Sequence, residues 1–104
     1  MRKLFISQPM NGLTDKEILE ERERIVKYVE NITGEKFEVI ESFIPMSRED
    51  SIKNMSVWYL GRSIQFLSEA DVVFFGKDWF KSRGCSIEHK IAEEYKLNII
   101  QEYW

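Results

Sequence analysis

The chain has 104 residues, 43% hydrophobic and 32% charged, which fits one folded domain (residues 1–104) and argues against a disordered chain. Fifteen basic and eighteen acidic side chains are well mixed, with a formal net charge of -3, which argues against duplex nucleic acid and membranes as partners. The single cysteine, Cys85, cannot form an internal disulfide, and one cysteine with one histidine cannot build a zinc site. We therefore expect a cytoplasmic domain that needs no metal and no cofactor.

The first predicted strand is the short apolar run at residues 4–6. It ends in a loop of turn-forming and polar residues, Ser7-Gln8-Pro9-Met10-Asn11-Gly12. Thr14 and Glu17 then have the spacing of a capping box, so a helix is predicted to begin there and to end at Gly34. The predicted inner stripe of this helix is Ile18, Leu19, Arg22, Ile25, Val26, Val29 and Ile32.

Residues 37–43 predict a second strand, whose charged side chains favour an edge position. The polar connection 44–55 is interpreted as either a mobile lid or an irregular wall of a site. Ser56 is the predicted cap of a second helix that runs to about Glu69. Its predicted inner face is Val57, Leu60, Ile64 and Leu67. The aromatic residues Trp58, Tyr59 and Phe66 lie on other faces, where they either contact another subunit or close over loop edges.

The most apolar stretch, residues 71–76, predicts a central third strand. A helix follows from about residue 84 to 96, with Ile87, Ile91, Ala92 and Tyr95 inward, and residues 97–100 form the last strand. This alternation of strands and helices predicts an α/β, Rossmann-like three-layer sandwich. We expect four parallel strands in the order 2-1-3-4 with three helices on the two faces.

That strand order brings the loops 7–12 and 76–88 together at the carboxyl edge of the sheet, where open α/β folds bind ligands. Glu88 is either an ordinary acid at a positive helix end or a nucleophile or general acid in a half-buried cleft. Asp78 is a second candidate carboxylate. Ser82 and Gly84 either hold a phosphate or hydroxyl at the helix start or simply cap the helix.

Two ring side chains, the indole of Trp79 and the imidazole of His89, flank these groups. Trp79 either stacks on a base or sugar ring or covers the end of the sheet. His89 is expected at the surface, about a quarter-turn away from Glu88.

Two sequence blocks resemble the nucleoside 2-deoxyribosyltransferase superfamily, in particular its small phage- and Firmicutes-type branch. The first is Leu4-Phe5-Ile6-Ser7-Gln8-Pro9-Met10-Asn11-Gly12. The second is Ala70-Asp71-Val72-Val73 followed by Asp78-Trp79, Ser82-Arg83-Gly84 and Glu88. The resemblance covers nearly the whole chain and implies a flavodoxin-like fold and a homo-oligomer.

The resemblance also implies a chemistry and a set of site residues. Glu88 would attack the anomeric carbon of a 2-deoxyribosyl group, and a second base or water would resolve the covalent intermediate. Ser82 would contact a 5′-phosphate where the substrate is a nucleotide. The catalytic residues implied are Glu88 and Asp78. The substrate-binding residues implied are Ser7, Gln8, Pro9, Met10, Gly12, Trp79, Ser82, Arg83 and Gly84.

The chain departs from the superfamily pattern at two positions. Ser63 stands where active relatives often have an aspartate, and Phe5 where they often have a tyrosine. A serine cannot donate a proton to a leaving base as a carboxylic acid does. Two functions therefore stay open: cleavage or transfer at an N-glycosidic bond, and binding of a nucleotide or nucleotide-derived ligand without turnover.

Overall fold

The computed structural model, described here for residues 1–43 and 51–102, has a single parallel sheet of four strands in the order β2-β1-β3-β4. The strands are β1 (Arg2–Ser7), β2 (Phe37–Val39), β3 (Val72–Phe75) and β4 (Ile99–Gln101). The helices are α1 (Asp15–Thr33), α2 (Met55–Leu67), the short 3-10 helix η1 (Trp79–Lys81) and α3 (Arg83–Glu94). The predicted flavodoxin-like sandwich and its strand order are confirmed, with β2 at an edge as expected.

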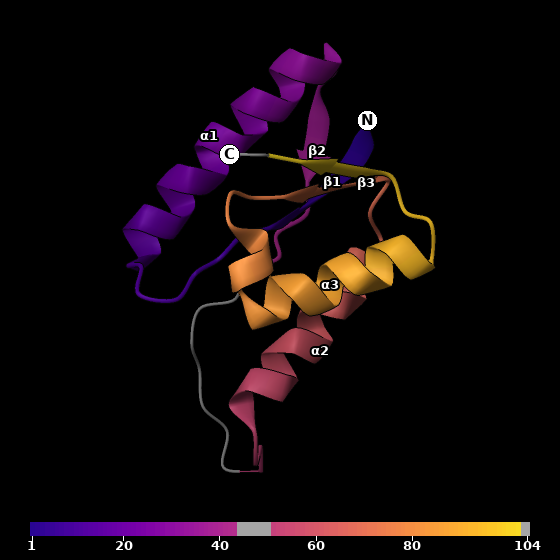
Figure 1. Cartoon of the computed structure of the whole chain (residues 1–104). Helices are drawn as coiled ribbons and strands as arrows, with labels where there is room; N and C mark the ends of the chain where they lie inside the picture. The colour runs from indigo at the N-terminus through magenta and orange to yellow at the C-terminus, as the bar shows by residue number, and fades with distance from the viewer. Residues whose placement is uncertain (44–50, 103–104) are drawn as a thin grey trace.

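The sheet lies between α1 on one face and α2 with α3 on the other (Figure 1). Alternation along β1 produces this division, because successive side chains of a strand point to opposite faces. Leu4 and Ile6 pack with Ile25 and Val29 of α1, whereas Phe5 packs on the opposite face in a second core cluster with Leu67 and Ala92.

The capping box predicted for the first helix is present. The Thr14 hydroxyl accepts a hydrogen bond from the Glu17 N–H, and the Glu17 carboxylate accepts one from the Thr14 N–H. Gly34 ends the helix at a φ of 68°, a left-handed conformation that glycine adopts without steric cost.

The buried stripe of α1 is narrower than predicted. Leu19 and Ile32 are about half exposed, although the spacing placed them inward. They lie at the margins of the stripe, since the sheet buries only the arc that contains Ile18, Ile25 and Val29.

The second helix begins two residues earlier than predicted and is capped differently. The side chain of Asn54, and not that of Ser56, accepts the hydrogen bond from the Val57 N–H. Val57 is 62% exposed, contrary to the prediction, whereas Leu67 at the other end of α2 is buried. Figure 1 shows the reason, since the start of α2 extends beyond the sheet and only its end packs on the strands.

Other boundaries also differ from the sequence predictions. The second strand is limited to Phe37–Val39, although the N–H of Ile40 still donates to the carbonyl of Leu4. On α3, Ile87 is 38% exposed and Tyr95 is 76% exposed, so neither is a core residue as predicted. Most of the connection predicted as a lid or wall, and the last two aromatic residues, lie outside the described residues.

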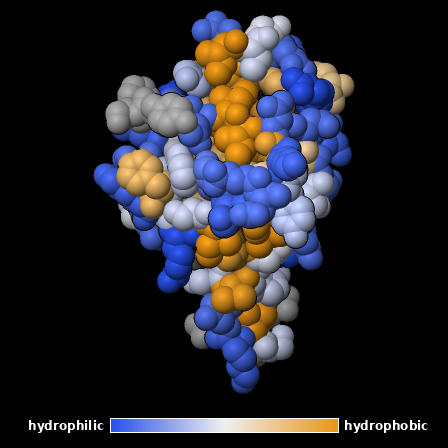
Figure 2. Space-filling view, turned by 45° about the vertical axis from the view of Figure 1, so that its right-hand side comes forward, coloured by the Kyte–Doolittle hydropathy of each residue, from blue (hydrophilic) through white to orange (hydrophobic). Residues whose placement is uncertain are grey.

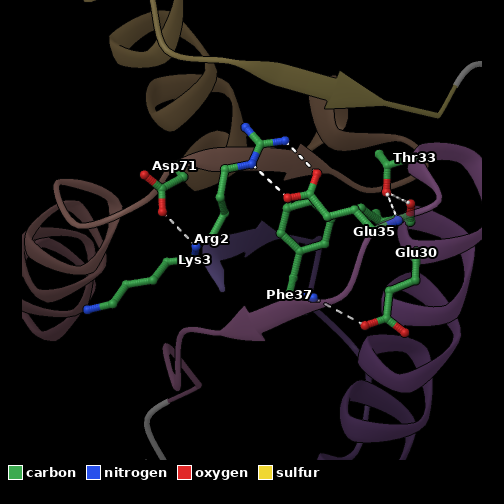
Figure 3. Close-up of polar contacts among 8 residues, drawn as sticks. Arg2, Lys3, Glu30, Thr33, Glu35, Phe37 and Asp71 are labelled. Atoms are coloured by element: carbon green, nitrogen blue, oxygen red, sulfur yellow. Dashed lines mark hydrogen bonds and ion pairs between the residues drawn. The ribbon is translucent and has the colours of Figure 1, made fainter.

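Polar contacts join the amino ends of the strands (Figure 3). Arg2 donates two hydrogen bonds to the carboxylate of Glu35, at 2.8 and 2.7 Å, and its guanidinium lies over the ring of Phe37. The N–H of Lys3 donates to the carboxylate of Asp71 at 2.7 Å. These side chains fix the amino edge of the sheet and leave the carboxyl edge for the loops that carry the candidate site.

The surface retains apolar side chains. Figure 2 shows them gathered in a band between polar side chains on one face. No helix within residues 1–43 and 51–102 has both the length and the apolarity to cross a membrane. The homo-oligomer implied by the resemblance stays a prediction.

Candidate functional site

The candidate site is centred on Glu88, a carboxylate almost completely buried on the second turn of α3. Its side chain accepts a hydrogen bond of 2.7 Å from the hydroxyl of Ser7. Burial raises the pKa of the Glu88 carboxyl above its ordinary value, while hydrogen bonds from the Ser7 and Ser63 hydroxyls lower it. A buried acid with a raised pKa in a concave site is a recognised sign of function.

Ser7 reaches Glu88 because of its place in the sheet. It is the last residue of β1 and pairs with Phe75, the last residue of β3, so it lies at the carboxyl edge between two central strands. The loop after β1 and the segment that leads into α3 therefore meet, as the predicted strand order requires.

The carboxylate of Glu88 lines a cavity of about 260 Å³, here named the Glu88 cavity. The sequence-predicted site residues that line it are Ser7, Gln8, Met10, Ser82, Arg83, Gly84 and Glu88. Lining residues that were not predicted for the site include Arg22, Ser42, Ser56, Tyr59, Leu60, Ser63 and Cys85. The α2 members recur at three- and four-residue spacing, which is a sequence signal that they share a wall, and Ser63 is also the position where the resemblance implied a proton donor.

Four predicted site residues do not line the Glu88 cavity. Pro9 and Asp78 line a neighbouring hollow, where Asp78 also lies 3.8 Å from the ammonium of Lys81. Gly12 occupies the turn after β1 with a φ of 80°. Trp79 stacks on His89 at a ring distance of 3.8 Å. The structure therefore does not bring Asp78 and Glu88 together as a pair of carboxylates in one cavity.

The amino end of α3 forms one wall of the cavity. Ser82 is its N-cap, and the Ser82 hydroxyl accepts a hydrogen bond from the N–H of Cys85 at 3.4 Å. Gly84 leaves open space at the first turn, since a Cβ atom there would meet nothing within 4 Å. A helix N-terminus carries unpaired N–H groups and a partial positive charge, so this wall favours anions.

Cys85 is buried beside these groups. Burial raises the pKa of its thiol, and the nearby carboxylate of Glu88 raises it further, against hydrogen bonds to Ser7 and Ser82 that lower it. A thiol in this state is a poor nucleophile, because the thiolate is the reactive form. The cysteine is a filler of the wall.

Arg22 of α1 places a buried guanidinium on another wall of the Glu88 cavity. It donates to the Gln8 side-chain oxygen at 3.4 Å, to the carbonyl of Ile40 at 3.1 Å and to the hydroxyl of Ser42 at 3.3 Å. All three acceptors are neutral. Burial lowers the pKa of Arg22, and the charge of Glu41 offsets this only in part.

His89 was expected at the surface, and this prediction is wrong. Its ring is buried, stacks on Trp79 with an interplanar angle of 7°, and contacts the ring of Phe75. Its Nε2 atom lies 2.9 Å from the Gln101 side-chain oxygen and its Nδ1 atom 3.2 Å from the Glu93 carboxylate. Trp79 and His89 thus cover the end of the sheet, which was one of the two interpretations of Trp79.

Within the described ranges, no three histidine, cysteine, aspartate or glutamate side chains gather closely enough to hold a metal ion. The groups that line the Glu88 cavity are a buried carboxylate, several hydroxyls, the amino end of α3 and the guanidiniums of Arg22 and Arg83.

Comparison with known proteins gives a family and a fold. The profile of the domain of unknown function DUF4406 matches residues 2–101. A solved structure described as a conserved protein from Enterococcus faecalis V583 superposes with a TM-score of 0.66 at 10% identity. The superposition covers 99% of this chain and 64% of the Enterococcus chain, so the present chain spans less than two thirds of that protein. A search of the curated proteins found no match.

Proposed function

Since the chain belongs to the DUF4406 family, whose description assigns no activity, we propose its function from the Glu88 cavity itself. The proposal is that the protein processes a nucleoside or nucleotide by breaking its N-glycosidic bond, with Glu88 as the nucleophile. The observation that carries it is the buried Glu88 carboxylate, held by the Ser7 hydroxyl at 2.7 Å and open to a cavity.

In the first step, a carboxylate oxygen of Glu88 forms a bond to the anomeric carbon of the sugar. The carbon–nitrogen bond breaks, and its electron pair leaves with the base, which takes a proton from water. An adjacent carboxylate stabilises the oxocarbenium-like transition state of such a reaction. Only the ionised form of Glu88 is a nucleophile, so burial and the Ser7 hydrogen bond oppose each other in setting its reactivity.

In the second step, water or a second base attacks the same carbon, and the bond to the Glu88 oxygen breaks. Water gives hydrolysis and a second base gives 2-deoxyribosyl transfer; in both cases the attacking group loses a proton and the carboxylate is restored. Two displacements at one carbon retain its configuration.

The alternative function is binding of a nucleotide or nucleotide-derived ligand without turnover. Two observations favour it. Ser63 lines the Glu88 cavity and is not an acid that protonates a leaving base. Phe5 is completely buried in the core and offers no hydrogen bond to Glu88.

The test is to incubate the protein with deoxynucleosides and their 5′-monophosphates and to measure released base by chromatography. We expect release by the wild type and loss of release in Glu88→Gln. Glu94→Gln is the matched control, because Glu94 is an exposed acid on the same helix, paired with Lys90. Equal results for wild type and Glu88→Gln on every compound contradict the catalytic proposal. A ligand-induced rise in Tm that persists in Glu88→Gln without release supports the binding alternative.

A further inference from the structure

The Glu88 cavity contains two buried charges of opposite sign that do not neutralise each other. The pKa of Glu88 responds to burial and to two serine hydroxyls, and that of Arg22 responds to burial and to Glu41. Neither residue forms a salt bridge among the described residues, although such a bridge is the usual way to bury either charge. The two groups thus line one cavity, each without a salt-bridge partner among the described residues, and the charge of Glu41 offsets the burial of Arg22 only in part.

Arg22 also retains unused hydrogen-bonding capacity. A guanidinium has five N–H donors. Nη1 uses one of its two and Nη2 uses both of its own, on acceptors 3.1 to 3.4 Å away. The N–H of Nε and one N–H of Nη1 have no acceptor among the residues that the structure describes. No fully enclosed side-chain nitrogen or oxygen in this part of the chain lacks a partner, so Nε is still accessible.

Placing a guanidinium in this position has an energetic cost that its neutral acceptors do not remove. Arginine stays protonated in proteins, so the charge persists even though burial lowers its pKa. Bidentate contact with a phosphate or carboxylate is the interaction for which the planar guanidinium is best suited. An anionic ligand group would use the free donors and supply the salt-bridge partner that Arg22 lacks.

We infer that Arg22 is a specificity-determining residue that selects ligands with an anionic group, in the first instance a phosphate, over neutral nucleosides. The inference rests on the proposed function, since it assigns the ligand of the Glu88 cavity to the phosphorylated class. The carboxylate of Glu88 faces the sugar carbon, where positive charge develops, and the guanidinium of Arg22 holds the negative group. The phosphate then compensates the charge of Arg22 on binding, and the sugar carbon offers positive charge to Glu88 only in the transition state.

The exposed Arg83 is the competing candidate for the same role, because it lines the Glu88 cavity from the first turn of α3. The two arginines differ in burial: Arg22 is 9% exposed, whereas Arg83 is exposed to solvent. A contact made by a buried guanidinium gains more than one made in water, because solvent screens the exposed charge. We therefore assign the discrimination to Arg22 and make Arg83 a control.

The experiment measures binding by calorimetry for deoxynucleoside 5′-monophosphates and their parent nucleosides, with inorganic phosphate as a separate probe. The quantity of interest is the ratio of the two dissociation constants. In the wild type we expect the monophosphates to bind more tightly. In Arg22→Met we expect this preference to fall roughly 10- to 100-fold, as for loss of charge-assisted hydrogen bonds.

Matched variants separate recognition from support of the fold. Arg62→Met removes an equal charge from an exposed residue of α2 that does not line the Glu88 cavity, and should change the preference by less than about twofold. If Arg22 served only to hold the loops in place, Arg22→Met would weaken the binding of nucleosides and of monophosphates equally. That result would overturn the inference. Loss of the preference in Arg83→Met but not in Arg22→Met would also overturn it.

If Arg22→Met does not fold, Arg22→Lys decides. It keeps the charge but loses the planar fork, so the preference should fall by about tenfold. An unchanged preference in that variant contradicts the inference. The outcomes also distinguish this inference from the proposed function. Phosphate preference that depends on Arg22, without any release of base, rejects catalysis and supports the inference. Release of base that requires Glu88, together with a phosphate preference that does not depend on Arg22, supports catalysis and rejects the inference.

Discussion

The hydroxyl of Ser7 donates a hydrogen bond of 2.7 Å to the carboxylate of Glu88, 81 positions later in the chain. Both side chains are almost completely buried, at 2% and 5% exposure. Because a hydrogen bond to a charged group is stronger in a poorly solvated environment, this contact fixes the orientation of the carboxylate and favours its ionised form.

Ser7→Ala should raise the pKa of Glu88, because it removes the hydrogen bond that most lowers it and leaves the effect of burial. The acid side of the pH–rate profile should then move to higher pH. A shift of one unit corresponds to about 1.4 kcal/mol, within the range expected for a hydrogen bond to a charged group. Rates measured from acid to neutral pH provide the check, and an unmoved profile would show that Ser7 does not control the ionisation of Glu88.

Glu88→Gln should stabilise the protein at neutral pH. The pKa of Glu88 is raised in the folded state, so the protonated form stabilises the fold fully below the unfolded value of 4.5. That stabilisation is lost as the pH rises through the folded pKa, at about 1.4 kcal/mol per unit of elevation. Urea unfolding from pH 4 to 8 should show this decrease in the wild type and not in Glu88→Gln. Glu94→Gln should retain the decrease.

Asn54→Ala should destabilise the protein by about 1 kcal/mol, the usual cost of losing an N-cap. Ser56→Ala is the matched control, since Ser56 is another cap-forming residue but does not accept the capping bond. It should leave the free energy of unfolding nearly unchanged. Chemical denaturation compares the free energies of unfolding of the two variants directly. A larger loss of stability in Ser56→Ala than in Asn54→Ala would show that Ser56, and not Asn54, caps α2.

Arg24→Met should cost about 2 kcal/mol, the value typical of hydrogen bonds to charged groups. Arg24 donates two hydrogen bonds to Glu102, whose side chain is only 2% exposed, so the variant leaves a buried carboxylate without its cation. Lys16→Met is the control, because Lys16 and its partner Glu20 are both highly exposed. Equal midpoints in urea for the two variants would show that the buried partner makes no difference.

Trp79→Leu should lower stability by about 2 kcal/mol through loss of contacts with His89 and Phe75. It should leave ligand affinity unchanged, because Trp79 does not line the Glu88 cavity. Thermal unfolding with and without ligand measures both quantities. A selective loss of the ligand-induced shift would mean that Trp79 contacts the ligand, as the sequence resemblance implied.

The elements that the sequence predicted well are those determined by local chemistry. The Thr14 and Glu17 capping box and the left-handed Gly34 depend on neighbours within one turn, and both are present. The strand order follows from the alternation of strands and helices with right-handed crossovers. Glu88 and Ser7 could be placed at one edge for the same reason.

The features that the sequence did not predict depend on tertiary contacts. Four residues of α3 have the spacing of a buried helical stripe: Cys85, Glu88, His89 and Ala92. The stripe could not be recognised as apolar in the sequence, because three of its members are polar or ionisable. Arg22 lies on the predicted inner stripe of α1, yet only the folded chain shows that it reaches Gln8 and Ser42. Asn54 and Ser56 are both good caps, and nothing local chooses between them.

The pairing of β1 with β3 has a consequence for how the chain is made. Leu4 pairs with Val72, and the N–H of Lys3 bonds to Asp71, 68 positions away. Within residues 1–43 and 51–102 every strand pairing is parallel, so no adjacent strands there are joined by a hairpin. During synthesis the centre of the sheet cannot assemble until Phe75, the last residue of β3, has left the ribosome, and contacts of such long range fold slowly. Until then α1 has no complete surface to pack on, so the nascent chain exposes the apolar side chains of β1 and depends on rapid completion of β3 to bury them.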